Sequence, residues 1–206
     1  WGGQVLDAAY VADVTARAHA RGLSTHLDGA RLFNAAVASR VAPREIARGF
    51  DSVSVCFSKG LGAPVGSALC GSREFIARAH RWRKMTGGGL RQAGILAAAA
   101  LHALDHHVER LAQDHEHARV LVQGLQGLPS IAVSTPQTNI VFIDILPAAQ
   151  AEMARRHPQG LPAALKDSGL LCTGLYRLRL VTHLDVDRAA IDQAVSILRR
   201  ALSPAA

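Results

Sequence analysis

The sequence is poor in aromatic residues and cysteines and has no long apolar segment, and each shortage excludes a class of protein. Aromatic residues make up only 4% of the 206 residues, which argues against a surface that stacks nucleic-acid bases. No uninterrupted apolar run approaches the roughly 20 residues that span a bilayer. The three cysteines, Cys56, Cys70 and Cys172, form no CxxC pair. We therefore expect buried thiols in a reducing, cytoplasmic setting.

The net charge of +7 has two interpretations. It could attract an anionic partner, or it could reflect an arginine-rich surface without such a partner. The arginines are scattered along the chain rather than gathered in one tract, which favours the second reading. We expect neither nucleic acid nor membrane as a partner. The opening residues, Trp1 to Gln4, lack both a starting Met and the basic and apolar parts of a signal peptide. We interpret them as a turn entered from upstream, so that the chain is part of a longer protein.

Strand-like segments alternate with helical patterns in the first half of the chain. Strand composition occurs at residues 23–28, 52–57 and 66–71. Helical patterns alternate with them. The first precedes residue 23 and ends near Gly22, with an apolar face formed by Tyr10, Val11, Val14 and Ala18. The second covers 32–37, and the third is capped by Ser72 and runs through His80. This alternation predicts an α/β fold with a mostly parallel sheet, whose ligands gather at the carboxyl ends of the strands.

The second half has a different organisation. A long helix is predicted from about Arg91 to about Leu125, as a bridge between two domains. A smaller α+β unit follows, in which Asp185 or Asp187 caps the last helix. Its other predicted elements are a strand over 139–145, mostly helix over 148–168, a strand over 177–182, and a last helix with Ile191, Val195 and Leu198 on its apolar face. We predict a first domain over residues 1–108 and a small C-terminal domain over 109–206, which begins with the bridging helix.

Three segments contain side chains suited to chemistry, namely 26–31, 58–66 and 177–183. Asp28 and Lys59 each follow a predicted strand, so a parallel sheet would present both at one crevice. A lysine amine, a carboxylate for a pyridine nitrogen and an arginine for a substrate carboxylate are what a pyridoxal-phosphate (PLP) enzyme needs. Arg31 or Arg179 could supply the arginine. The glycines after Lys59 allow a tight turn near such a cofactor.

Other interpretations of these residues are less favoured. Asp28 alone could be a helix cap, and Lys59 alone a solvated surface lysine. The stretch 60–66 resembles a dinucleotide loop, but its last glycine comes one residue late and Pro64 stands where a helix would begin. Five histidines of the long helix show no facial cluster with a carboxylate, so we expect a solvated helix face and no metal; they are His102, His106, His107, His115 and His117.

Four stretches together resemble one family, the low-specificity L-threonine aldolases, which depend on PLP. They are HLDGARLFN at 26–34, DSVSVCFSKGLGAPVG at 51–66, RWRKMTGGGLRQAG at 81–94 and RLVTHLDV at 179–186. They occur in the family's order, and the resemblance covers most of the chain from residue 1 to about residue 200. It implies a PLP-dependent lyase that cleaves L-threonine or L-allo-threonine to glycine and acetaldehyde.

The resemblance also implies a role for individual residues. Lys59 resembles the lysine that forms the Schiff base with the cofactor, and Asp28 the partner of the pyridine nitrogen. Arg31 and Arg179 resemble the arginines that hold the substrate carboxylate. Two further basic residues match family positions near a cofactor site across a subunit boundary; these are Lys84 and Arg91.

The implied fold is the large domain of the aspartate-aminotransferase type (fold type I), N-terminally incomplete, with a small α+β C-terminal domain. The implied assembly is a homo-oligomer, and by analogy with the family we expect a tetramer. The family's N-terminal portion supplies the phosphate loop and two histidines, which cannot be placed in this chain. Two alternatives stay open: another fold type I lyase or racemase, and a catalytically silent fragment that serves as a structural or interaction domain.

Overall fold

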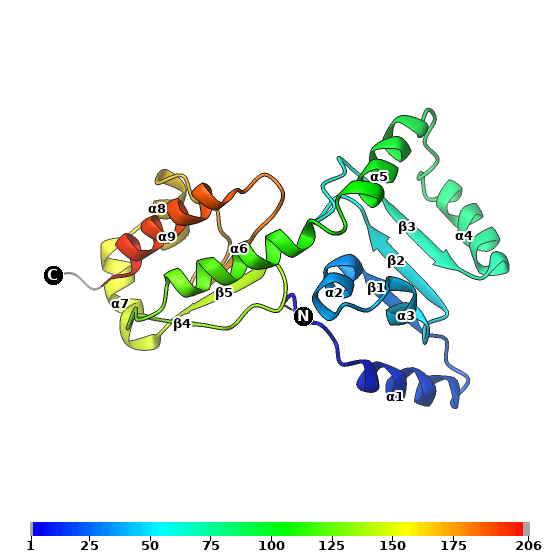
Figure 1. Ribbon diagram of the computed structural model, residues 1–206, viewed down its shortest axis with the longest axis horizontal. Helices are drawn as coiled ribbons and strands as arrows, with labels where there is room; N and C mark the ends of the chain where they lie inside the picture. The colour runs from blue at the N-terminus through cyan, green and yellow to red at the C-terminus, as the bar shows by residue number, and fades with distance from the viewer. Residues whose placement is uncertain (1, 204–206) are drawn as a thin grey trace. The chain divides into compact units, whose positions relative to one another are not determined.

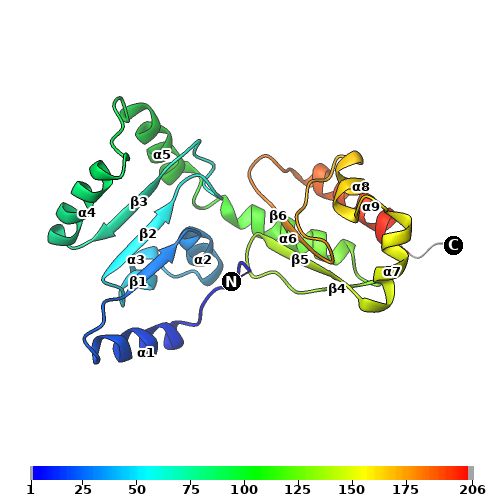
Figure 2. The same cartoon turned by 180° about the vertical axis from the view of Figure 1, so that it is seen from behind.

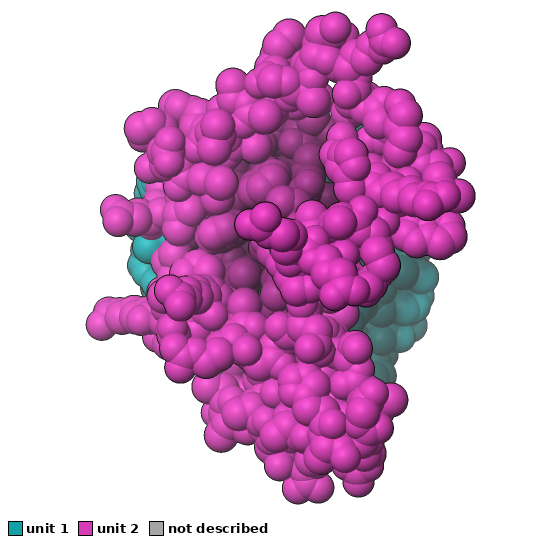
Figure 3. Space-filling model, turned by 90° about the vertical axis from the view of Figure 1, so that its right-hand side faces the viewer, with its two compact units in different colours: residues 1–4, 112–206 teal, residues 5–111 magenta. Residues whose placement is uncertain are grey.

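The computed structural model describes residues 2–203, and in it the chain forms two compact units. Unit 2 is the continuous stretch 5–111, and unit 1 combines the described residues up to Gln4 with those from Ala112 onward (Figure 3). Trp1, where the expected opening turn starts, lies outside the described residues, whereas Gly2 and Gly3 do form a turn. The predicted boundary between a first domain, residues 1–108, and a C-terminal domain, residues 109–206, stays a prediction.

Unit 2 contains a three-stranded sheet in the order β1-β2-β3 (Figure 1). Its elements are α1 (Ala8–His19), β1 (His26–Gly29), α2 (Leu32–Ser39), α3 (Pro43–Ala47), β2 (Ser52–Cys56), β3 (Ser67–Gly71), α4 (Arg73–Met85) and α5 (Gly94–His106). β1 and β2 are parallel, but β2 and β3 are antiparallel. The expectation of a mostly parallel sheet is therefore wrong for β3, whereas the parallel pairing of β1 and β2 agrees with it. A ten-residue loop reverses the chain between β2 and β3, and a parallel pair would need a longer crossover.

The apolar side of this sheet is covered by α2 and α3. Leu32 of α2 is buried together with Val53 and Val55 of β2, and Ile46 of α3 packs against the same cluster. The sheet and these two helices can be followed from both sides in Figures 1 and 2. This packing fixes where β1 and β2 end, and so where the residues that follow them are placed.

Helix α1 is present and ends before Gly22, as predicted, but its buried residue is not one of those on the predicted face. Asp7 caps it by accepting a hydrogen bond from the Tyr10 amide. The predicted apolar face is only partly correct. Val11 and Ala18 are partly buried, but Tyr10 and Val14 are exposed, and Thr15 is the buried residue. The Thr15 hydroxyl donates to the Val11 carbonyl, and its side chain lies against Gly49, where a Cβ would come within 2.7 Å of the Thr15 Oγ1. Helical spacing alone therefore located only part of the contact face.

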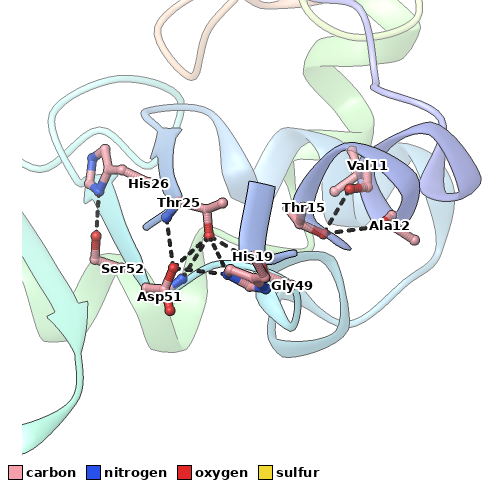
Figure 4. A network of polar contacts seen from close by, with 9 residues as sticks. All are labelled: Val11, Ala12, Thr15, His19, Thr25, His26, Gly49, Asp51 and Ser52. Carbon is pink, nitrogen blue, oxygen red and sulfur yellow. Dashed lines mark hydrogen bonds and ion pairs between the residues drawn. The ribbon is translucent and has the colours of Figure 1, made fainter. Parts of the chain in front are cut away.

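A polar network joins the end of α1 to the starts of β1 and β2 (Figure 4). The Asp51 carboxylate accepts from the Thr25 amide at 2.7 Å and from the Thr25 hydroxyl at 2.9 Å, and pairs with His19 Nε2 at 3.0 Å. These contacts, above all the Thr25 amide, lower the pKa of Asp51 to about 2. Beside it, His26 Nδ1 and the Ser52 hydroxyl are hydrogen-bonded at 2.9 Å. The network thus fixes the amino ends of the two parallel strands.

Unit 1 is an antiparallel sheet in the order β4-β5-β6 with helices packed on it. Its elements are α6 (Leu111–Gly124), β4 (Ile131–Val133), β5 (Ile140–Ile145), α7 (Pro147–Arg156), α8 (Leu161–Asp167), β6 (Arg177–Val181) and α9 (Arg188–Leu202). Asp187, one of the two predicted caps, accepts from the Ala190 amide at 2.8 Å. Ile191 and Leu198 of the predicted apolar face are buried in the core of this unit.

The predicted single helix from Arg91 to Leu125 is wrong, because the chain leaves the helical path between His106 and Leu111. Residues 107–110 form a turn in which the Leu111 amide donates to the Val108 carbonyl. The break allows His107 to donate its Nδ1–H to the Leu61 carbonyl and allows Leu111 to be fully buried beside Leu61. Tertiary contacts thus override a continuous helical pattern.

The expectation of buried thiols is also only partly correct. Cys56 and Cys172 are partly buried, and burial raises the pKa of the Cys172 thiol. Cys70 is exposed and lies on β3, an edge strand of its sheet.

Within residues 2–203, no helix is both long enough and apolar enough to cross a membrane.

Candidate active site

Asp28 and Lys59 lie at the same edge of the sheet in unit 2. β1 and β2 run parallel, with Asp28 in register with Ser54, and Lys59 follows the end of β2 by three residues. Neighbouring strands are about 5 Å apart, so the carboxylate and the amine come from the carboxyl ends of two adjacent strands. Sequence reasoning placed Asp28 just past a strand, whereas it is the third residue of β1.

Both side chains are exposed and open to a ligand. One Asp28 oxygen, Oδ1, accepts from the Ala30 amide at 3.1 Å, a bond that orients the carboxylate. Among residues 2–203, neither the second Asp28 oxygen nor the Lys59 amine has a hydrogen bond or ion pair within the chain. The edge thus presents an acceptor for a protonated ring nitrogen and an amine able to attack an aldehyde.

The Lys59 loop, residues 57–66, is held by its own backbone. The Phe57 amide donates to the Gly66 carbonyl, and the Ala63 amide donates to the Phe57 carbonyl, both at 3.0 Å. Within it, the Gly62 amide donates to the Lys59 carbonyl at 2.9 Å, which closes a turn that starts at the lysine. Gly62 has a φ of +71°, a left-handed conformation that favours glycine. The turn anticipated from the glycines is therefore present.

The arginines occupy two different units. Arg31 is the partly buried residue immediately before α2, three positions after Asp28 in the same segment of unit 2. Arg179 belongs to unit 1 and is the central residue of β6, where it pairs with Phe142 of β5. Its backbone also exchanges two hydrogen bonds with Thr173, which fixes its place in the strand. Arg31 therefore lies in the segment that directly follows Asp28, and the roles of both arginines stay predictions.

Lys84 and Arg91 flank the glycine-rich turn after α4. Lys84 lies in the last turn of α4 and Arg91 just beyond Gly89, and both side chains are exposed. The Lys84 side chain lies along Gly89, where a Cβ would come within 2.9 Å of it. Exposed basic groups suit an anionic ligand, and their assignment to the site stays a prediction.

Sequence reasoning missed two residues that contact the Lys59 loop. Asn34 of α2 is buried, and its Oδ1 lies 3.1 Å from where a Cβ of Gly60 would be. His107, which follows α5, donates its Nδ1–H to the Leu61 carbonyl at 2.6 Å. Asn34 lies within a quoted motif and could have been singled out there. The His107 contact joins residues 46 positions apart, so no local pattern indicates it.

The chemistry of the side chains identifies this site better than the shape of the surface does. The described part of the chain has an apolar hollow between β3 and α4, lined by residues such as Leu69, Phe75 and Trp82, and none of the candidate residues lines it. Nor do three His, Cys, Asp or Glu side chains within residues 2–203 gather in a way that could hold a metal ion.

Known proteins resemble the chain over nearly all its length. It is 40% identical over 201 residues to the low specificity L-threonine aldolase of Escherichia coli (strain K12), which covers 98% of this chain and 58% of that protein. It is 38% identical over 205 residues to low-specificity L-threonine aldolase 1 of Arabidopsis thaliana, which covers 98% of this chain and 56% of that protein. The chain therefore spans just over half the length of the curated relatives that it matches.

Solved structures share the fold. A protein of Exiguobacterium sp. 255-15, provisionally described as an aromatic amino acid beta-eliminating lyase/threonine aldolase, superposes with a TM-score of 0.77 at 25% identity. That match covers 97% of this chain and 58% of the other. The threonine aldolase of Leishmania major superposes with a TM-score of 0.72 at 21% identity, over 95% and 57% of the two chains. The chain thus has the α/β fold of the fold type I enzymes, over part of their length.

The family model described as beta-eliminating lyase matches residues 1–147, which include Asp28, Arg31, Lys59, Lys84 and Arg91. That stretch is more than half of the chain and contains the whole Lys59 loop. The chain therefore belongs to the beta-eliminating lyase family.

Proposed function

We propose that this chain is part of a PLP-dependent aldolase that cleaves L-threonine and L-allo-threonine to glycine and acetaldehyde. The observation that carries the proposal is the pair at the carboxyl edge of β1 and β2, where Asp28 and Lys59 present an open carboxylate and an open amine. The names of the relatives, low-specificity L-threonine aldolases at 38–40% identity, support the choice of substrate.

The residues present fit PLP by the chemistry of their side chains. Lys59 would hold the cofactor through its aldehyde carbon, and Asp28 would hold a proton at the pyridine nitrogen. When bound, PLP accepts the electron pair that is released as the substrate Cα–Cβ bond breaks. The turn that begins at Lys59 is closed by backbone hydrogen bonds, which keep the amine at the sheet edge. Binding of the cofactor would therefore not have to order the loop.

Two arginines would orient the amino acid. Arg31 and Arg179 each offer a planar guanidinium that can bind a carboxylate through two parallel hydrogen bonds. Lys84 and Arg91 would add positive charge around an anionic cofactor and substrate.

We also propose that the protein is a cytoplasmic homo-oligomer, with a tetramer as the expected state. Several large apolar side chains from α4 to α5 are exposed, the kind of surface that subunit interfaces cover; they are Trp82, Met85, Leu90, Ile95 and Leu101. Sedimentation equilibrium of the full-length gene product tests this, and a monomer at micromolar concentration would refute it.

The test of the cofactor site uses the full-length product of the gene that encodes this chain. The chain contains only three lysines, Lys59, Lys84 and Lys166, so peptide mapping can distinguish them. After incubation with PLP and reduction with borohydride, we expect the pyridoxyl group on Lys59. The Lys59→Ala variant should lose both this adduct and aldehyde release from threonine, while the control Lys166→Ala keeps both. An adduct on another lysine, or full turnover in Lys59→Ala, would refute the assignment.

A further inference from the structure

We propose that His107 is a positioning residue that holds the Lys59 turn in its working conformation. His107 follows the last residue of α5, and its Nδ1 lies 2.6 Å from the Leu61 carbonyl oxygen. A carbonyl oxygen can only accept, so Nδ1 must carry the proton and donate. The imidazole thereby bonds the backbone two residues beyond the lysine. The role in catalysis rests on the proposed function, but the contact itself does not.

The bond reaches the turn at a point that controls the lysine. The turn runs from Lys59 to Gly62, closed by the Gly62 amide and the Lys59 carbonyl, and Leu61 is its third residue. Leu61 is also anchored by its side chain, which is 2% exposed in a cluster with Ala103 and Leu111. Fixing both the carbonyl and the side chain of Leu61 leaves the turn little freedom to rotate.

The other central residue of the turn is held from the same side. A Cβ on Gly60 would lie 2.8 Å from Leu111 Cδ2, so the backbone here rests directly on the Leu111 side chain. Leu111 follows His107 by four residues, across the turn that separates α5 from α6. The short segment 107–111 therefore holds both central residues of the Lys59 turn, one by a hydrogen bond and the other by packing.

The backbone of His107 is set independently of its side chain. Its amide donates to the Ala103 carbonyl at 2.9 Å, the last bond of α5. The ring is partly buried, and the His102 ring approaches it edge-on with centroids 5.3 Å apart. The ring is thus directed at Leu61 by the end of a helix, a rigid support for a positioning contact.

His107→Asn and His107→Leu form a matched pair for the test. The two replacements have nearly the same shape, but only Asn retains a nitrogen that can donate to the Leu61 carbonyl. His106→Asn is the control, because His106 is exposed on the same helix and has no bond to the Lys59 loop among the described residues. Experiments use the full-length gene product.

The first measurement needs neither cofactor nor activity. Endoproteinase Lys-C cleaves after lysine but not after arginine, and cleavage at Lys59 requires the turn to open locally. In the apo-protein we expect His107→Leu to be cleaved at Lys59 about tenfold faster than wild type, the effect of one typical hydrogen bond on an opening equilibrium. His107→Asn and His106→Asn should match wild type, and cleavage at Lys166 should not change in any variant. Equal cleavage at Lys59 in the Asn and Leu variants would overturn the proposal.

The second measurement separates this inference from the proposed function. Per bound PLP, His107→Leu should lower kcat for threonine cleavage by about tenfold or more, because displacement of a reacting group by about 1 Å can cost about 100-fold. Its KM for threonine should stay near the wild-type value, because His107 does not hold the substrate. Wild-type protein that shows the protected turn but releases no aldehyde would refute the proposed function alone. An active His107→Leu variant with unchanged kcat would overturn the positioning role.

Discussion

Replacing Gly60 by Ala tests how firmly the Lys59 turn is held. The new Cβ would lie 2.8 Å from Leu111 Cδ2 and 3.1 Å from Asn34 Oδ1. Carbon atoms in contact are normally about 3.5–4.0 Å apart, so the backbone or Leu111 must shift by about 0.7–1.2 Å. Leu111 is fully buried and Asn34 is 2% exposed, so neither has open space to move into. The φ of Gly60 is outside the left-handed region, and the penalty is therefore steric.

The expected cost of Gly60→Ala is about 1–3 kcal/mol of unfolding free energy, as for other overpacked cores. If the backbone takes up the shift, threonine cleavage should fall by up to about 100-fold. Urea titration and a coupled aldehyde assay on the full-length gene product measure the two effects. Gly94→Ala is the control, because a Cβ there meets nothing within 4 Å and Ala suits the start of α5.

A double-mutant cycle identifies the source of the strain. Leu111→Val shortens the side chain that the new methyl group meets, so the double variant should be less destabilised than the sum of the single variants. The expected coupling is about 0.5–3 kcal/mol, the range for residues in contact. The reasoning is wrong if Gly60→Ala behaves like Gly94→Ala, or if the effects of the two changes simply add.

Two further predictions concern stability against pH. The pKa of Asp51 is lowered to about 2, so its contacts stabilise the fold above its ordinary pKa of 3.8, and this contribution is lost as the pH falls toward 2. Asp51→Asn should therefore flatten the decline of Tm over that range, whereas Asp13→Asn, which removes an exposed ion pair, should leave the decline unchanged. Burial lowers the pKa of His115 below 6.5, so its contribution to stability is present above pH 6.5 and is lost as the pH falls through the folded-state pKa. His115→Gln should reduce the slope of unfolding free energy below pH 6.5, and an unchanged slope would contradict the assignment.

Part of the candidate site could be predicted from sequence patterns because the positions of its residues follow local rules. Asp28 and Lys59 could be placed at one edge because each stands at the end of an apolar segment with strand composition, and two such strands did prove to be parallel neighbours. Asp187 was predicted as a cap because a cap acts on an amide three residues away. Signals of this kind need no knowledge of the rest of the chain.

Features that depend on distant contacts could not be predicted. The break after His106 follows from contacts with Leu61, far back in the chain, and not from a helix-breaking residue. The exposed Tyr10 and the buried Thr15 likewise reflect what α1 packs against rather than its own periodicity. The direction of β3 depends on the loop after β2, whose glycines indicated a tight turn but not a reversal of the chain.

The division of the chain between the two units has a consequence for the order of folding. Gly3 belongs to unit 1, where its carbonyl accepts a hydrogen bond from the Thr138 hydroxyl, 135 positions further along the chain. All of unit 2 lies between these residues in the sequence. Closing so long a loop in an unfolded chain costs about 4 kcal/mol in entropy from the logarithmic term alone. Prior folding of unit 2 would shorten the loop, so the continuous unit should form first and the discontinuous one should be completed last.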